Sequence, residues 1–544
     1  MPASVREIAA ELVVTEAAVK QHLLNLYDKF GVEEGVESRR IRLARAAVVQ
    51  GVLPGTGVPV PTDASSLVKG RAAATSRAWD EAYAALSDAA SSESFDVADL
   101  ELLANAATWT GRFEASTAAR EQAYATYLSV GDRRSAARVA LGLGWNAAVT
   151  LRFSVVAGWM ASAGRLLAPD SDTRDAPVWP EHGLMLSLMA LNELGTGQLE
   201  PGLEHARAAF EIGRRTGDLD IQALGLVFQG FGLVHQGRLD EGRALLDEAM
   251  ASATAGHLGT LAQGMVYCRT LSACIDTFDY GRAIEWSREI ERRAPGLGTV
   301  GFPGDCRTHR AAVLVVRGEW TRGAAEAETA AVESRAYDLG HTAQALTALG
   351  DIRLRQGDLA AAREAFDRAA ELGLPPGPGF ALVQLAEGDP EAALVSVLRA
   401  AELAGREPLT RARYLPAIIE IARAARAADH ARTACADLAA IAASFPSPVL
   451  AAAAAEGMGG VAHMSGDLGA AIAHLREATA RWRSVGAPYE AARCRMHGAH
   501  VAAALGDQGE AAREARSALA SWSELGARRD AEAATAFLGR FVAT

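Results

Sequence analysis

Four polar side chains near the N-terminus lie within six consecutive residues, a spacing suited to hydrogen bonding with the edges of DNA bases. They are Lys20, Gln21, His22 and Asn25. Basic and amide side chains near the start of an α-helix contact base edges when that helix enters the major groove. A second, basic group is better suited to phosphates, because flexible charges position a protein without reading sequence. Its members are Lys29, Arg39, Arg40, Arg42 and Arg45.

The flanking residues predict two helices that would position these groups. Residues 5–12 predict a first helix, and the Thr15 hydroxyl is suited to cap a second helix by accepting a backbone N–H. An apolar stripe at three- and four-residue spacing runs along the second helix: Val19, Leu23, Leu26 and Phe30. The polar side chains fall on the opposite face. The alternative interpretation is a small amphipathic cap with a solvated polar face.

This pattern resembles the DNA-binding domain of LuxR-type bacterial transcription regulators. The residues that carry the likeness are Glu7-Ile8-Ala9, Leu12, Thr15, Val19-Lys20, His22-Leu23 and Lys29-Phe30-Gly31-Val32. The resemblance implies sequence-specific binding to double-stranded DNA, with Thr15, Lys20, Gln21 and His22 at contacting positions. Domains of that family carry one more helix before Val5, so we expect the first helix of the module to be missing here. Residues 38–51 resemble the final helix.

Most of the remaining chain is repetitive. A turn followed by an amphipathic helix recurs, as at Gly237-Arg-Leu-Asp and Gly357-Asp-Leu-Ala, and the equivalent turns are 31 to 44 residues apart. The expected turn positions are Arg77, Gly111, Phe153, Gly197, Gly237, Asp276, Gly318, Gly357, Gly388, Ala427, Gly466 and Gly506. The residue five positions later is small in eleven of the twelve cases, Arg432 being the exception. Small residues let antiparallel helices approach closely, and the pattern resembles the tetratricopeptide repeat.

The sequence therefore predicts an all-α protein with two parts. Residues 1–51 form the helix-turn-helix module, residues 52–66 are a Pro- and Gly-rich linker, and residues 67–544 form a tetratricopeptide-like α-solenoid of about twelve helix hairpins. One hairpin cannot bury its own apolar face, so the hairpins are expected to stack into a superhelix with an inner groove. Segments 109–113, 181–183 and 305–320 resemble the repeat arrays attached to some actinobacterial LuxR-type regulators.

The groove is expected to bind a protein or peptide, or a small effector. By register with tetratricopeptide repeats, the inward positions include Trp109, Phe231, His235, Thr347, Asp351 and Arg355. Chaperone-binding repeats of this type carry a Lys and Asn cluster that clamps a terminal carboxylate, and that cluster is not found here. A co-chaperone role is therefore disfavoured.

No sequence pattern supports catalysis. The chain has no phosphate-binding loop of the Gly-x-x-x-x-Gly-Lys-Ser/Thr type, no nucleophile elbow and no His-Glu-x-x-His. LuxR-type regulators with repeats often carry an ATPase, which this chain lacks. Cys494, His497 and His500 share one predicted helix face, but a fourth metal ligand is missing and a packed face explains them. We expect no enzyme activity, no cofactor and no metal.

Charge and cysteine usage limit the setting. The net charge is −12, whereas residues 1–57 hold seven basic and seven acidic side chains, so any DNA contact must be local. Five cysteines form no Cys-x-x-Cys pair, and neither a leader nor an apolar span is evident, which indicates a cytoplasmic protein that does not cross a membrane. The favoured hypothesis is a DNA-binding transcription regulator whose superhelix binds a partner or effector. The alternative is a protein-interaction scaffold without DNA binding, and a homodimer is left open.

Overall fold

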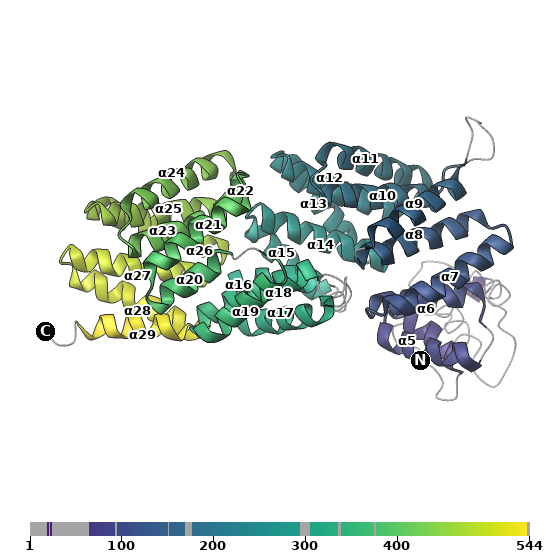
Figure 1. The fold of residues 1–544 in the computed structure, drawn as a ribbon, viewed down its shortest axis with the longest axis horizontal. Coiled ribbons are helices and arrows are strands. Elements are labelled where there is room, and N and C mark those ends of the chain that lie inside the picture. The colour runs from purple at the N-terminus through teal and green to yellow at the C-terminus, as the bar shows by residue number, and fades with distance from the viewer. Residues whose placement is uncertain are drawn as a thin grey trace. The chain divides into compact units, whose positions relative to one another are not determined.

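The computed structural model describes residues 19, 20, 22, 23, 65–92, 95–150, 152–168, 177–293, 305–335, 339–374 and 377–540. Every regular element in these residues is an α-helix (Figure 1). The chain divides into two compact units, which we call unit 1 (Met1–Ala168) and unit 2 (Pro169–Thr544). The expected all-α class is confirmed. None of the described helices is both long and apolar enough to cross a membrane.

Unit 1 consists, from residue 65 onward, of helices that pair with their neighbours in sequence. They are α4 (Ser66–Thr75), α5 (Trp79–Ser92), α6 (Val97–Trp109), α7 (Phe113–Ser129), α8 (Arg133–Val149) and α9 (Phe153–Leu167). Alanines such as Ala82, Ala104 and Ala123 are fully buried where the helices meet. Their small side chains allow the close helix approach that the repeat pattern predicts.

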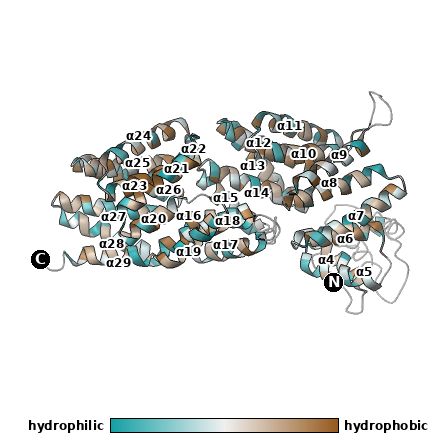
Figure 2. Cartoon of the chain, in the orientation of Figure 1, coloured by the Kyte–Doolittle hydropathy of each residue, from teal (hydrophilic) through white to brown (hydrophobic). Residues whose placement is uncertain are grey.

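Unit 2 continues the same helical hairpins. Its first helices are α10 (Pro180–Gly195), α11 (Leu199–Thr216), α12 (Leu219–His235), α13 (Leu239–Thr254), α14 (Thr260–Asp276), α15 (Tyr280–Arg293), α16 (Asp305–Arg317), α17 (Trp320–Ser334), α18 (Leu339–Gln356) and α19 (Leu359–Glu371). They are followed by α20 (Pro378–Glu387), α21 (Pro390–Ala404), α22 (Pro408–Ala412), α23 (Leu415–Ala424), α24 (Ala428–Ser444), α25 (Pro448–Met464), α26 (Leu468–Val485), α27 (Pro488–Ala504), α28 (Gln508–Leu525) and α29 (Arg528–Gly539). In most hairpins the first helix is the more apolar, as α23 and α25 illustrate in Figure 2. This stacking of hairpins is a tetratricopeptide-like solenoid, as expected.

The turn inside each hairpin places one residue in the left-handed backbone region. Glycine fills this position in most hairpins, for example Gly237 with φ 83°, because it has no Cβ to clash. Three non-glycine residues also adopt it: Arg77, Phe278 and Arg426. The expected turn position at Arg77 is therefore confirmed. The expected positions Asp276 and Ala427 are wrong by two residues and one residue, because the sequence offers no glycine to mark the turn there.

The corrected register removes the exception in the small-residue pattern. With Arg426 as the turn residue, the position five residues later is Ala431, which is fully buried, rather than Arg432. The expected turn position Phe153 is instead the first residue of α9.

Unit 2 closes on itself, because its last helices pack against helices from its middle. One buried core cluster combines residues of α16 to α18, such as Val315 and Ile352, with residues of α27 to α29, such as Met496 and Phe537. Where these helices meet, the Trp320 and Tyr489 rings lie edge to face, 5.4 Å apart. Arg529 at the start of α29 donates to the Ala386 carbonyl at the end of α20, and Figure 1 shows α29 next to α19. The superhelix thereby encloses an interior.

Candidate functional site

A cavity of about 400 Å³ lies inside the closed part of unit 2, and we call it the inner cavity. Its lining comes from many hairpins, beginning at the α14–α15 turn and ending with α29. The apolar lining includes Phe278, Leu354, Leu382, Leu450 and Trp482. The charged lining consists of Asp351, Arg355, Arg413, Glu420, Glu456, Glu490, Arg493, Arg529 and Asp530. The volume falls in the range of small-ligand pockets.

Arg355 on α18 is held across the inner cavity by α27. Its Nη1 atom lies 2.6 Å from Glu490 Oε1, and its guanidinium carbon lies 4.8 Å from the centre of the Tyr489 ring. Burial works to lower the pKa of Arg355, but the charge and hydrogen bond of Glu490, together with Tyr489 and Asp351, more than reverse this effect and raise that pKa. The charge of Arg355 is therefore already engaged in an ion pair with Glu490 and a cation–π contact with Tyr489.

Arg493, one turn further along α27, forms a second ionic group. It pairs with Glu456 on α25 and, at 3.1 Å, with Glu420 on α23. The Trp482 indole also donates to Glu456 at 3.0 Å. Burial works to lower the pKa of Arg493, and the two carboxylates more than reverse that effect. Three consecutive hairpins are thus linked at the cavity wall.

Asp351 is the carboxylate of the inner cavity that has no protein partner among the described residues. It lies four residues before Arg355 on the same helix, a spacing that normally allows an ion pair. Arg355 reaches instead to Glu490, so it acts on Asp351 only through its more distant charge. Burial raises the pKa of Asp351 to about 6, and the charge of Arg355 only partly opposes this.

Arg413 connects the cavity wall to His235, one of the expected groove residues. Arg413 pairs with Asp276 at 2.7 Å, and His235 Nε2 lies 3.4 Å from the same carboxylate. Phe231 stacks on the His235 ring at 4.2 Å. Burial works to lower the pKa of His235, but its hydrogen bonds to Asp276 and to the Phe231 carbonyl, together with the charge of Asp276, more than compensate and raise that pKa. The expected pair Phe231 and His235 is therefore linked to the cavity through Asp276 and Arg413.

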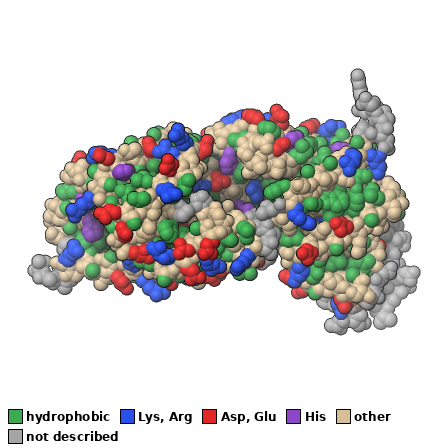
Figure 3. All heavy atoms as spheres, in the orientation of Figure 1, with side chains coloured by type: hydrophobic (Ala, Val, Ile, Leu, Met, Phe, Trp, Pro, Cys, Tyr) green, Lys and Arg blue, Asp and Glu red, His purple; other side chains and the backbone are tan. Residues whose placement is uncertain are grey.

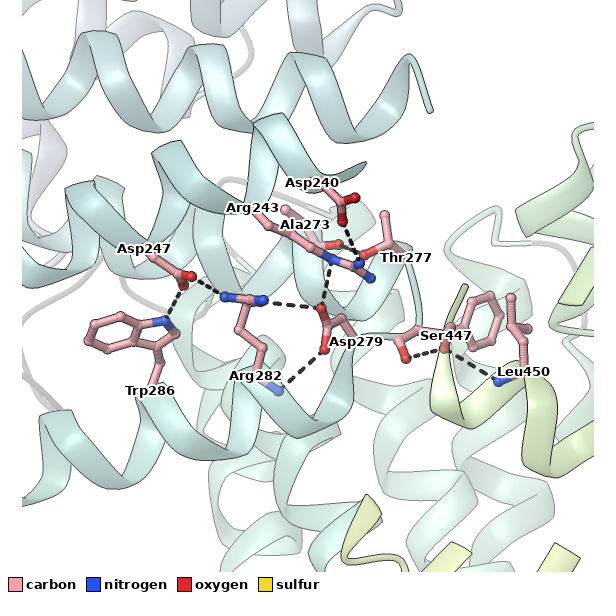
Figure 4. Close-up of polar contacts among 11 residues, drawn as sticks. Asp240, Arg243, Asp247, Ala273, Thr277, Asp279, Arg282, Trp286, Ser447 and Leu450 are labelled. Carbon is pink, nitrogen blue, oxygen red and sulfur yellow. Dashed lines mark hydrogen bonds and ion pairs between the residues drawn. The ribbon is translucent and has the colours of Figure 1, made fainter. Parts of the chain in front are cut away.

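The turn that carries Phe278 into the cavity wall is fixed by a second charged network (Figure 4). Asp279 pairs with Arg243 on α13 at 2.9 Å and with Arg282 on α15 at 3.3 Å. Arg282 also pairs with Asp247, which accepts a hydrogen bond from the Trp286 indole at 2.8 Å.

On its other side, this turn docks against α25. The Ser447 hydroxyl donates to the Phe278 carbonyl at 2.8 Å, although the two residues are 169 positions apart. Ser447 also caps α25, because its side chain accepts from the Leu450 backbone N–H. One hydroxyl therefore joins a distant turn to the start of a cavity-lining helix.

A second cavity of about 230 Å³ adjoins the first and shares Glu420 and Arg493 with it. Within it, His497 Nε2 lies 2.9 Å from His463 Nδ1 and 3.2 Å from the Arg423 guanidinium. Burial, reinforced by the charge of Arg423, lowers the pKa of His497 to about 2. His497 is therefore neutral and accepts these hydrogen bonds.

Cys494, which shares a helix with His497 and His500, is buried in the core. Burial raises the pKa of its thiol. Across the described part of the chain, no three His, Cys, Asp or Glu side chains are grouped as a metal site would require.

Of the four remaining expected groove residues, two lie outside the inner cavity and two line it. Trp109 belongs to unit 1, where its ring lies 6.3 Å from that of Trp79. Thr347 on α18 donates to the Ala343 carbonyl of its own helix and does not line the inner cavity. Asp351 and Arg355 do line it. A binding role for each of these residues stays a prediction.

Most of the expected DNA-binding module lies outside the described residues. This applies to Thr15, Gln21, Asn25, Lys29, Arg39 and Arg40. Lys20 and His22 are helical and exposed, whereas the neighbouring Val19 on the same helix is only 5% exposed. These few residues agree with the expected inward and outward faces, but they do not establish a helix-turn-helix.

Sequence reasoning missed most of the cavity lining, including Glu420, Glu490 and Arg493. A signal existed for Glu420, which lies six residues before the turn residue Arg426, just as Asp351 lies six residues before Gly357. The misplaced turn at Ala427 concealed this equivalence. Glu490 and Arg493 contact partners 135 and 73 residues away, and no repeat register reveals such contacts.

No protein-family model and no curated protein sequence matches the chain. Solved structures resemble it weakly. The complex Cut9–Hcn1 of the APC/C matches at 12% identity over 86% of this chain and 95% of that one, with a TM-score of 0.35. NprR in complex with its cognate peptide NprX matches at 15% identity over 64% and 97%, with a TM-score of 0.42. Yeast Tom70 matches at 12% identity over 87% and 95%, with a TM-score of 0.33. At these scores no partner is transferred to this chain, and its class, an α-solenoid with an inner cavity, rests on its own geometry.

Proposed function

We propose that the chain is an interaction protein whose inner cavity binds an extended segment of a partner protein. The observation that carries this proposal is the inner cavity of about 400 Å³, to which helices from α16 to α29 contribute. Apolar side chains such as Leu382 and Trp482 alternate there with charged ones such as Asp351. A peptide offers the same mixture, with apolar side chains for the pockets and polar groups for orientation.

The distribution of charge on the outer surface favours the inner cavity, rather than an outer face of one charge sign, as the binding site. In Figure 3, acidic and basic side chains are interspersed over the region of α16 to α19 and α28 to α29 rather than gathered by sign. Many of them pair with each other, as Arg353 does with Glu328 and Arg363 with Glu387. Such exposed pairs contribute little to binding or stability.

The proposal is tested by selecting peptides from a random display library against the full chain. Enriched peptides are then measured by fluorescence anisotropy on the wild type and on Ala386→Trp, which places a large ring at the cavity wall. The matched control is Ala370→Trp on the exposed face of α19. We expect Ala386→Trp to weaken binding at least tenfold and Ala370→Trp to leave it unchanged. Equal binding to all three proteins, or the absence of enriched peptides, contradicts the proposal.

A second candidate function, DNA binding by residues 1–51, is supported by one observation. Val19 is buried, whereas Lys20 and His22 are exposed, which is the arrangement that a recognition helix needs. We propose on this basis that the full chain acts as a DNA-binding regulator.

DNA binding is tested by titrating the full chain with sheared genomic DNA at two salt concentrations. The variant Lys20→Ala is compared with Lys69→Ala on α4. We expect Lys20→Ala to weaken binding and to reduce the salt slope by about 1 if Lys20 contacts a phosphate, or to relax sequence preference if it contacts a base. Identical DNA affinity and salt slope for both variants and the wild type contradict DNA binding through Lys20 and leave only the scaffold function.

A further inference from the structure

We propose that the inner cavity selects a cationic group, an ammonium or a guanidinium, and that Asp351 is the carboxylate that receives it. This inference rests on the proposed binding of a peptide segment in the same cavity, and it names the chemistry that would be recognised there. The argument compares the hydrogen-bond donors and acceptors of the cavity wall.

The charged donors of the wall already have partners. Arg355 is paired with Glu490, Arg413 with Asp276, and Arg493 with Glu420 and Glu456. Arg529, exposed at the edge, donates to the Ala386 carbonyl. At Arg355, Arg413 and Arg493, a ligand carboxylate would have to displace a protein carboxylate, which costs the existing ion pair. The wall is therefore poorly prepared for an anion.

Hydrogen-bond acceptors on the cavity wall, in contrast, are still available to a ligand. Asp351 accepts no hydrogen bond from any described residue, and Glu490 Oε2 is buried without a partner. Among the described residues, Asp530 accepts one hydrogen bond, from the Tyr489 hydroxyl at 3.0 Å. Burial raises the pKa of Asp530, which indicates that its charge is incompletely compensated. Five carboxylates and four guanidinium groups line the cavity, so the excess is acidic.

The backbone makes room for the Asp351 carboxylate. A Cβ atom on Gly379 would lie 2.5 Å from Asp351 Oδ1 and 2.4 Å from the Phe366 ring, so a larger residue there would force the Asp351 or Phe366 side chain to move. Gly379 and Asp351 both line the inner cavity. Because Arg355 is held by Glu490 and Tyr489, the carboxylate one turn away remains available to a donor-rich ligand.

A cation is also what relieves the energetic cost of this arrangement. Burial raises the pKa of Asp351 to about 6, so its charge is unfavourable in the empty cavity. A bound ammonium or guanidinium favours the ionised form and restores a charge-assisted hydrogen bond. Binding is therefore expected to weaken as the pH falls below about 6.

The test uses the full chain and three blocked pentapeptides, Ala-Ala-Xaa-Ala-Ala, in which Xaa is arginine, norleucine or glutamate. Saturation-transfer NMR detects millimolar affinities for these probes, and agmatine serves as the free cation. We expect the arginine peptide to bind at least tenfold more tightly than the norleucine peptide. Asp351→Asn is expected to abolish this preference while keeping the norleucine affinity. The control Asp367→Asn, on the exposed face of α19, should change neither.

The outcomes separate this inference from the function on which it rests. Equal or tighter binding of the norleucine or glutamate peptide, or a preference that survives Asp351→Asn, overturns the cation inference and leaves peptide binding intact. Agmatine binding that depends on Asp351, without peptide binding, supports the cation inference and overturns the peptide function. If no probe binds, both are overturned. Retained norleucine binding by Asp351→Asn shows that the variant is folded.

Discussion

Unit 1 and unit 2 are built from the same helical hairpins, but their polar contacts span different distances along the chain. In residues 65–168 the longest such contact joins Tyr124 to Ser162, 38 residues apart. In unit 2, Arg355 contacts Glu490 at a separation of 135 residues. The comparison shows that nearest-neighbour stacking builds a solenoid, whereas an enclosed site needs side chains that join hairpins several repeats apart.

The largest difference is expected from breaking one ion pair between helices in each unit. Arg493→Ala in unit 2 leaves Glu420 and Glu456 without their cation, so we expect a loss of about 2 to 3 kcal/mol. Arg138→Ala in unit 1 removes a pair with Glu101 in which the arginine is 41% exposed, and should cost less than about 1 kcal/mol. Hydrogen exchange by mass spectrometry reports each unit separately. Similar losses would remove the distinction between the units.

Acidification should also act on the two units differently. The folded pKa of His497, about 2, lies below its unfolded value, so the stability it preserves is complete above pH 6.5 and is lost as the pH falls. We expect unit 2 to lose about 2 kcal/mol between pH 7 and pH 5. Residues 65–168 contain no histidine and should change little. Hydrogen exchange at both pH values measures this, and His497→Asn is expected to flatten the response; an unchanged response contradicts the assignment.

An effect of opposite sign is expected at Asp351. Its folded pKa of about 6 lies above the ordinary value, so its ionisation destabilises unit 2 increasingly as the pH rises from about 4 to 6, and the cost is complete above pH 6. Asp351→Asn should therefore stabilise unit 2 at pH 8 by up to about 3 kcal/mol, because each pKa unit corresponds to about 1.4 kcal/mol, and most of the gain should vanish near pH 4. Thermal unfolding monitored by circular dichroism tests this, with Asp367→Asn as the control. A gain that is independent of pH would exclude the charge as its cause.

The smallest effect concerns what the units share, the left-handed turn residue. Arg426→Gly removes the Cβ clash at a φ of 56° and should stabilise unit 2 by about 0.5 kcal/mol, after the entropic cost of glycine. Arg77→Gly in unit 1, at a φ of 59°, should have a comparable effect. Thermal unfolding of both variants measures this. Destabilisation of either would mean that the arginine side chain contributes more than the backbone strain costs.

The repeat pattern was sufficient to predict the helical hairpins, because glycine turns and buried alanines are local features. Gly237, Gly357 and Gly466 adopt the left-handed conformation that their position demands. Where Phe278 takes this place, no glycine marks the turn in the sequence, and the predicted turn position is wrong by two residues. At Phe278 the left-handed turn residue packs against distant hairpins and its carbonyl accepts from Ser447, contacts that a single repeat does not contain.

The candidate site was only partly predictable, for a related reason. Register alone placed Asp351 and Arg355 on an inward face, and they line the inner cavity. It could not reveal that Arg355 would turn to Glu490 and leave Asp351 without a partner, because that choice depends on where α27 returns. Trp109 occupies a similar register but belongs to a different unit. Inward register is therefore necessary for a site residue but does not identify one.

The hydrogen bond between the Ser447 hydroxyl and the Phe278 carbonyl also limits how this protein can change in evolution. Open repeat arrays tolerate the duplication or deletion of a unit, because each hairpin recognises only its neighbours. The hydrogen bond fixes the number of hairpins between Phe278 and Ser447, because one hairpin more or one fewer would place the Ser447 hydroxyl out of reach of the Phe278 carbonyl. Growth of the array is compatible with the inner cavity only outside the stretch that its long-range contacts span, from Phe278 to Arg529.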